Sequence, residues 1–207
     1  RETIMPLFVT TLTDSPVAVG LIPAIFSVSY YLPQLFAANH AESMKRKLPF
    51  VMFIGGVFER VPYFLLGLAV LFLAQDAPTL TLILLFLAIG MGAFGAGVAT
   101  PAWFTMIGKV LPVNRRGVFF GFSEGLGALI GIAGAVVVGI VLDQVAYPTN
   151  FAVLFLVAAL FMGISWIGLA LNREPESPIV KQQIPIRRYF KQLPSILREN
   201  HNFRHFL

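Results

Sequence analysis

Runs of about 20 apolar residues recur along most of this chain, and each is long enough to cross a bilayer core of about 30 Å. Hydrophobic residues make up 57% of the sequence and charged residues only 12%, against roughly 45–50% and about 25% in soluble domains. The strands of a membrane β-barrel would alternate in polarity over segments of about 10 residues, and no such segments are present. The sequence therefore predicts an all-α, polytopic bundle of transmembrane helices.

Six apolar segments are predicted within residues 1–171. The first, at about 3–13, starts almost at the beginning of the sequence without a signal-peptide pattern, which we interpret as the remainder of a truncated helix. The others cover about 16–38, 49–74, 79–107, 117–142 and 150–171. Short turns join several of these segments, as expected for antiparallel neighbours.

The basic residues predict the orientation of the bundle. If the segments alternate in direction, nearly all of the 15 lysines and arginines fall on one side. The short turns on the other side carry only Asp14, Asp76 and Asp143. The basic side should face the cytoplasm, in a multi-pass protein of the plasma membrane. We therefore interpret the net charge of +5 as a topology signal rather than as a nucleic-acid-binding surface.

Residues 172–207 form a second region, which is polar and basic. The apolar residues within 184–197 recur at helical spacing, which predicts an amphipathic helix on the cytoplasmic membrane face. The last residues, "NFRHFL", turn apolar again and are expected to begin a further span.

Small residues follow each other at intervals of four in two segments. Gly127, Gly131, Ala135 and Gly139 do so in 117–142, and Gly92, Ala96 and Thr100 in 79–107. Such rows let helices approach closely in lipid. They predict either fixed packing faces or faces that slide between two states.

Glu59 and Arg60 are adjacent in the middle of the segment 49–74. Each charge costs about 2.5–3.5 kcal/mol at the bilayer centre, while one Leu or Phe returns only about 0.3–0.6 kcal/mol. Neighbours on a helix do not face each other well, so we expect each charge to have a partner on another span. Glu2 and Glu124 lie at suitable depths to pair with Arg60.

Charged residues inside a membrane are functional candidates by default. The carboxylates Glu2 and Glu59 could carry a coupling proton. The alternative is a structural ion pair that fixes helix packing. Polar side chains in the cytoplasmic half of 16–38 and near the inner end of 79–107 are weaker candidates for a solute cavity: Tyr30, Gln34, Thr100 and Trp103.

Sites of other kinds are not predicted. The sequence has no cysteine and only three histidines. His201 and His205 are four residues apart, but no Glu accompanies them in the His-Glu-x-x-His order of a zinc-protease motif. The sequence has no phosphate-binding loop and no nucleophile elbow. We therefore expect no metal, no cofactor and no enzymatic activity.

The order of these features resembles the amino-terminal half of a major facilitator superfamily transporter. The segment "LPVNRRGVFFGF" (111–122) is similar to the Pro and basic-Gly pattern between the fourth and fifth helices of that superfamily. The Gly- and Ala-rich "GMGAFGAGVATPAWF" resembles its fourth helix, and the glycines of 117–142 resemble its fifth.

The sequence departs from the superfamily's best-known signature, between helices two and three. Here that stretch is "QLFAANHAESMKRKLPF", with Gln34 at the place of the signature Gly and no Asp after it. Its basic end persists as Lys45, Arg46 and Lys47. The fourth-helix Arg and the fifth-helix Gly-Pro are also absent.

The resemblance implies a secondary active transporter that binds a small solute between this half and a second half of the same chain. It implies a cavity-lining role for Glu2 on the first helix, and it favours the structural ion pair for Glu59 and Arg60, since the third helix lies outside the cavity. The basic loop residues are then candidates for gating at the cytoplasmic face: Lys45, Arg46, Lys47, Arg115 and Arg116. One alternative is a membrane anchor or sensor whose activity lies in a soluble domain; a membrane-embedded enzyme is another, but no pair of catalytic groups supports it.

Overall fold

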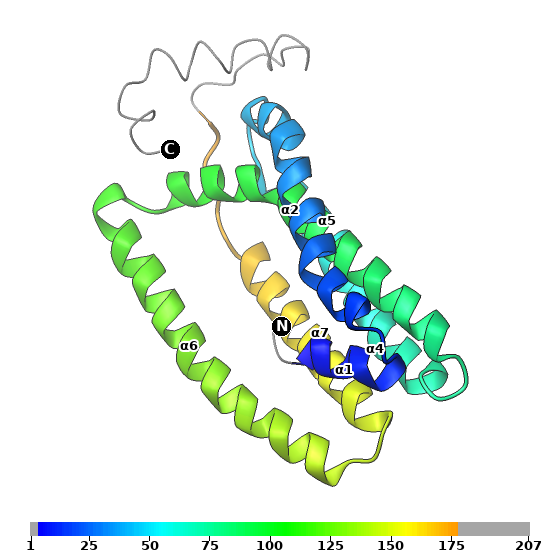
Figure 1. The fold of residues 1–207 in the computed structure, drawn as a ribbon. Helices are drawn as coiled ribbons and strands as arrows, with labels where there is room; N and C mark the ends of the chain where they lie inside the picture. Colours follow the sequence, from blue (N-terminus) through cyan, green and yellow to red (C-terminus); the bar gives the residue numbers. More distant parts are fainter. Residues whose placement is uncertain (1–3, 178–207) are drawn as a thin grey trace, which may run out of the picture.

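The computed structural model describes residues 4–177, and Figure 1 shows their arrangement. Glu2 and the predicted amphipathic helix within 184–197 lie outside the described residues. Within 4–177 the chain forms helices and no strands. Five of these helical segments are long and apolar enough to cross a membrane, which confirms the prediction of a polytopic helical bundle.

The helices follow the predicted segments closely. α1 (Ile4–Leu12) is short, and α2 (Pro16–Glu42) is long. One continuous span consists of α3 (Leu48–Ile54), the π-helix η1 (Gly55–Arg60) and α4 (Val61–Leu73). The remaining spans are α5 (Pro78–Val110), α6 (Val113–Gln144) and α7 (Thr149–Ala170).

The connection between α5 and α6 is shorter than the sequence predicted. We expected a basic loop around 108–116, but only Leu111 and Pro112 separate the two helices. Pro112 lies just before α6, where its fixed φ and missing N–H interrupt one helix and tolerate the start of the next. Arg115 and Arg116 therefore belong to the first turn of α6.

The core lies between α1, α2, α4, α5 and α7. Its fully buried side chains include Phe8, Leu66, Val70, Leu85 and Ile89. The ring of Phe8 packs on Phe151 of α7, with 4.9 Å between centroids. Tyr147 donates to the Ala74 carbonyl and Gln75 donates to the Tyr147 carbonyl, each over 3.2 Å. The α4–α5 and α6–α7 turns therefore lie at the same end of the bundle.

α5 makes close contacts through its glycines. A methyl group at Gly97 would collide with the Tyr30 carbonyl of α2, and one at Gly92 would lie 2.8 Å from the Tyr63 ring. The small residues of α5 thus pack tightly, which agrees with the interpretation of this row as a packing face.

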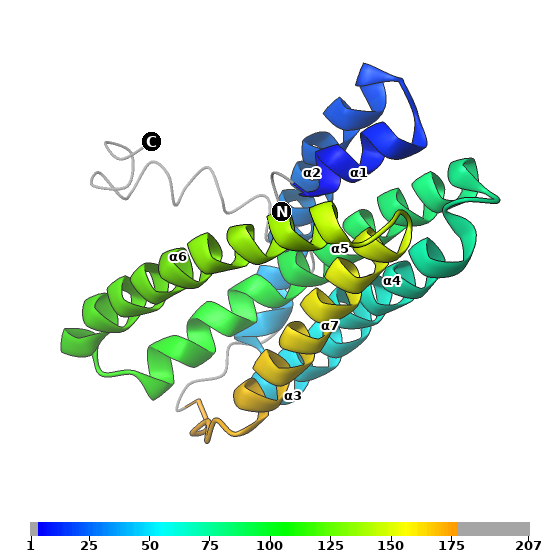
Figure 2. The same ribbon diagram turned by 90° about the horizontal axis from the view of Figure 1, so that it is seen from below.

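α6 differs from α5 in its packing. It lies apart from the other helices in Figures 1 and 2 and buries no residue. A methyl group added at Gly127, Gly131 or Gly139 would have no other atom within 4 Å among the described residues. This row of glycines therefore makes no close packing contact within residues 4–177, and the two interpretations of it stay predictions.

Candidate functional site

Glu59 and Arg60 contact each other, contrary to the sequence prediction. Arg60 Nη1 lies 3.3 Å from Glu59 Oε2. Both residues end the π-helix η1, in which the Val61 N–H donates to the Gly56 carbonyl five residues back. This winding differs from that of the α-helix assumed in the prediction. Neighbouring side chains are therefore placed differently, and these two can meet.

Arg60 also binds backbone carbonyls. Its Nη1 donates to Gly55 over 2.6 Å, and its Nε donates to Met162 of α7 over 3.0 Å. In the opposite direction, Trp166 Nε1 of α7 donates to the Met52 carbonyl of α3 over 2.9 Å. These bonds join the middle of the α3–η1–α4 span to α7.

The charged pair lines a cavity of about 570 Å³. Tyr30 of α2, together with Thr100 and Trp103 of α5, lies on the same cavity. Pockets of 300–1,000 Å³ are typical of small-molecule sites. The lining continues beyond these five residues predicted from the sequence, with Phe119 of α6 and with Ser165 and Asn172 at the α7 side.

One hydrogen bond spans the cavity wall between α2 and α5. The Tyr30 hydroxyl and Thr100 Oγ1 are 3.2 Å apart, and Thr100 Oγ1 also donates to the Ala96 carbonyl over 2.6 Å. Gln34 does not line the cavity. Its Nε2 instead donates to the Tyr30 carbonyl over 3.2 Å.

The other predicted charges are placed differently. Glu124 is exposed on α6 and takes no part in the Arg60 contacts. Pairing of Arg60 with Glu124 is therefore wrong, because the guanidinium is used within η1 and by α7. Glu2 lies outside the described residues, so its predicted role remains an expectation.

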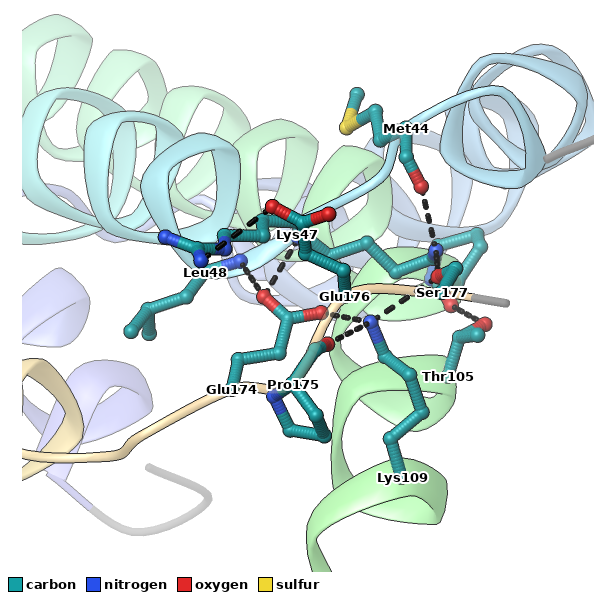
Figure 3. A network of polar contacts seen from close by, with 11 residues as sticks. Met44, Lys47, Leu48, Thr105, Lys109, Glu174, Pro175, Glu176 and Ser177 are labelled. Atoms are coloured by element: carbon teal, nitrogen blue, oxygen red, sulfur yellow. Dashed lines mark hydrogen bonds and ion pairs between the residues drawn. The ribbon is translucent and has the colours of Figure 1, made fainter. Parts of the chain in front are cut away.

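Figure 3 shows a second polar cluster. It lies at the start of α3, whereas Asp76 follows the other end of the α3–η1–α4 span. Glu174, which follows α7, is central to it, with a side chain only 1% exposed. Its Oε2 accepts from the backbone N–H groups of Lys47 and Leu48, over 2.6 and 2.7 Å. Its Oε1 forms an ion pair with Lys109 of α5. The carboxylate thus joins the start of α3, the end of α5 and the segment after α7.

Ser177 completes this cluster. Its hydroxyl lies 3.1 Å from Lys47 Nζ and 3.2 Å from Lys109 Nζ, and its N–H donates to the Lys45 carbonyl over 2.9 Å. Lys47 Nζ also donates to the Met44 carbonyl over 3.0 Å.

The environment shifts two pKa values in the cluster. Burial alone would raise the pKa of Glu174, but the hydrogen bonds from Lys109, Leu48 and Lys47 together hold that pKa below its usual range. Burial lowers the pKa of Lys47, and the charge of nearby Lys109 lowers it further. Glu174 is therefore ionised near neutral pH.

The basic residues predicted as gates have unlike surroundings. Lys47 is buried in the Glu174 cluster, whereas Arg46 forms an exposed pair with Glu176 over 3.4 Å. Lys45 and Arg115 are exposed. Arg116 donates to the Gly108 and Leu111 carbonyls, which satisfies acceptors at the carboxyl end of α5.

The sequence reasoning missed Glu174, Ser165 and Asn172. Glu174 carried a signal, because it is an acidic residue just after a span in an otherwise basic region. Ser165 and Asn172 carried none, since single polar residues near a helix end have many ordinary roles. Among residues 4–177, no group of His, Cys, Asp or Glu is arranged to hold a metal ion.

Comparison with known proteins gives one match. A family model described as "Major Facilitator Superfamily" matches residues 2–206. No curated protein and no solved structure matches the chain.

Proposed function

This chain belongs to the Major Facilitator Superfamily, a family of membrane transporters, and we propose that it moves a small solute by alternating access. The observation that carries the proposal is the cavity inside the bundle with the Glu59–Arg60 pair on its wall. Such a pair is costly in a membrane, and a solute site accounts for its position beside a cavity rather than in closed packing. Small-molecule sites of this kind combine apolar walls with a few polar groups.

The complete transporter is proposed to place this bundle against a second half of the same chain in the plasma membrane. The basic end, with Lys47 and Lys109, would face the cytoplasm. The Glu174 cluster and the basic residues Lys45, Arg46, Arg115 and Arg116 would then lie where an inner gate opens and closes.

Cysteine accessibility tests alternating access directly. These 207 residues contain no cysteine, and any cysteine elsewhere in the full-length protein would be replaced first. We expect Ser165→Cys, on the cavity wall, to react with a membrane-impermeant thiol reagent added from either side of oriented vesicles of the full-length protein. Ser15→Cys and Ser43→Cys, at opposite ends of α2, are matched controls that should each react from one side only. Reaction of Ser165→Cys from one side only would contradict alternating access and favour the anchor or sensor alternative.

Proton coupling is the finer part of the proposal, with Glu59 as the proton carrier. We expect the full-length Glu59→Gln protein to insert normally and to lose solute accumulation driven by a pH gradient, while exchange of solute at equal pH persists. Unchanged gradient-driven accumulation would exclude Glu59 from coupling and leave it a structural role.

A further inference from the structure

The charges on the cavity wall indicate which class of solute fits there. Among the described lining residues, Glu59 and Arg60 are the charged ones, and they are opposite in sign. The two form an ion pair with each other, so this wall is neutral overall, and the net charge of an ionic solute would remain uncompensated in a site of low dielectric. A solute with one charge of each sign adds no net charge and can contact both members of the pair.

Arg60 retains a donor for such a solute. Its Nε and Nη1 are used by Met162, Gly55 and Glu59, whereas Nη2 has no hydrogen bond within residues 4–177. Because no buried side-chain nitrogen or oxygen in this range lacks a partner, Nη2 is accessible. The residue lines the cavity, so the cavity is where an acceptor can reach it.

Three aromatic rings contribute to the remaining walls. Tyr30, Trp103 and Phe119 line the same cavity. Trp103 is held edge-on to Phe120, with 6.3 Å between ring centroids, and Tyr30 stacks on Phe26 at 5.7 Å. Aromatic faces bind apolar rings and also attract ammonium groups.

We propose that this cavity binds a zwitterion of the α-amino-acid class with an aromatic side chain. Its carboxylate accepts from Arg60, its ammonium lies against Glu59, and its ring lies among Tyr30, Trp103 and Phe119. This inference rests on the proposed transport function, and it names the class of solute that the same cavity would bind.

Three ligands with one aromatic ring and different charges test the proposal. L-Phenylalanine has both charges, phenethylamine lacks the carboxylate, and 3-phenylpropanoate lacks the ammonium. Their affinities would be measured by calorimetry on the purified full-length protein in micelles, with empty micelles subtracted. We expect phenylalanine to bind about tenfold or more tightly than either analogue, since each analogue loses one charge-assisted contact. Equal or tighter binding of an analogue would overturn the proposal.

Variants assign each charge of the ligand to its partner. Arg60→Gln should shift the preference towards phenethylamine, and Glu59→Gln should shift it towards 3-phenylpropanoate. A merely structural role of the pair would weaken all three ligands alike and would refute the assignment. Asp143→Asn, exposed in α6 and outside the cavity, is the control with no expected change. If the pair variants fail to fold, the three affinities on the unmodified protein still decide the solute class.

Binding and transport can fail separately in this design. Zwitterion-selective binding without phenylalanine exchange in proteoliposomes would support the site and refute the transport function. Transport of another solute together with absent phenylalanine binding would refute the site and leave the transport function standing.

Discussion

Replacing Glu174 by Gln should strongly destabilise the full-length protein. The carboxylate accepts hydrogen bonds from Lys47 N–H, Leu48 N–H and Lys109 Nζ. A glutamine keeps one acceptor oxygen, which can still accept hydrogen bonds from the N–H groups of Lys47 and Leu48. Its amide nitrogen would then face Lys109, which places a donor against a donor. The ammonium of Lys109, whose side chain is 15% exposed, would lose its counter-ion.

The size of the loss follows from that broken pair. Removing one partner of a buried ion pair costs about 3–5 kcal/mol. For 150–250 residues each kcal/mol corresponds to roughly 2–4 °C in Tm, and the shift is smaller in a longer chain, so we expect a fall of several degrees and at most about 20 °C.

Thermal unfolding in micelles, followed by tryptophan fluorescence, measures this change. Glu176→Gln is the matched control, since Glu176 and its partner Arg46 are both 61% exposed and such pairs contribute at most about 1 kcal/mol. A Glu174→Gln protein as stable as this control would refute the reasoning that one carboxylate joins three segments.

Three further predictions use the same measurement. The folded pKa of Glu174 lies below its unfolded value, so its stabilisation is present above the unfolded pKa and is lost as pH falls through the folded pKa. Tm should therefore drop more steeply between about pH 5 and pH 3 in the parent than in Glu174→Gln. Parallel curves of Tm against pH would contradict this. Gly97→Ala should cost about 1–3 kcal/mol of stability, because its methyl group meets the backbone of Tyr30 and α2 must move away from α5. Gly163→Ala is the control and should be neutral or slightly stabilising, because its methyl group would have no other atom within 4 Å among the described residues. Equal losses in the two variants would argue against close packing at Gly97. Glu59→Gln and Arg60→Gln should each destabilise by about 3–5 kcal/mol while the double variant loses much less than their sum, and additive losses would show that the pair is not coupled.

Hydropathy was sufficient to predict the helices, because a span must be a continuous apolar run and must satisfy its own backbone hydrogen bonds. It also placed Tyr30, Thr100 and Trp103 at similar depths, and the structure brings all three to one cavity. The depth of a residue in the membrane follows directly from its position along a predicted span. Which helix face a residue occupies depends on neighbours, and Gln34, at a similar depth, falls outside the cavity.

The contacts that define the site depend on features that a regular helical pattern does not contain. The change of winding at Gly55 alters the direction of every side chain in η1, and with it the prediction for Glu59 and Arg60. Glu174 meets Lys47 across more than half of the described chain, and no local spacing relates the two. Arg116 was predicted in the loop between 79–107 and 117–142, whereas it lies in the first turn of α6 and donates to carbonyls at the carboxyl end of α5.

The charged pair, the π-helix and α7 are best understood as one unit. Two charges at mid-membrane cost about 5–7 kcal/mol, and three hydrogen bonds of a charged donor return about 1.5–3 kcal/mol each, so the contacts of Arg60 are of the size needed to hold the pair there. Those contacts include Gly55 in η1 and Met162 in α7, and Trp166 adds a bond from α7 back to α3. A movement that separated α7 from this span would expose both charges to lipid, so the two should move together. The rearrangement that opens the cavity is then placed on its other walls, at the Tyr30–Thr100 contact and at α6, which meets the cavity through Phe119 and buries no residue of its own.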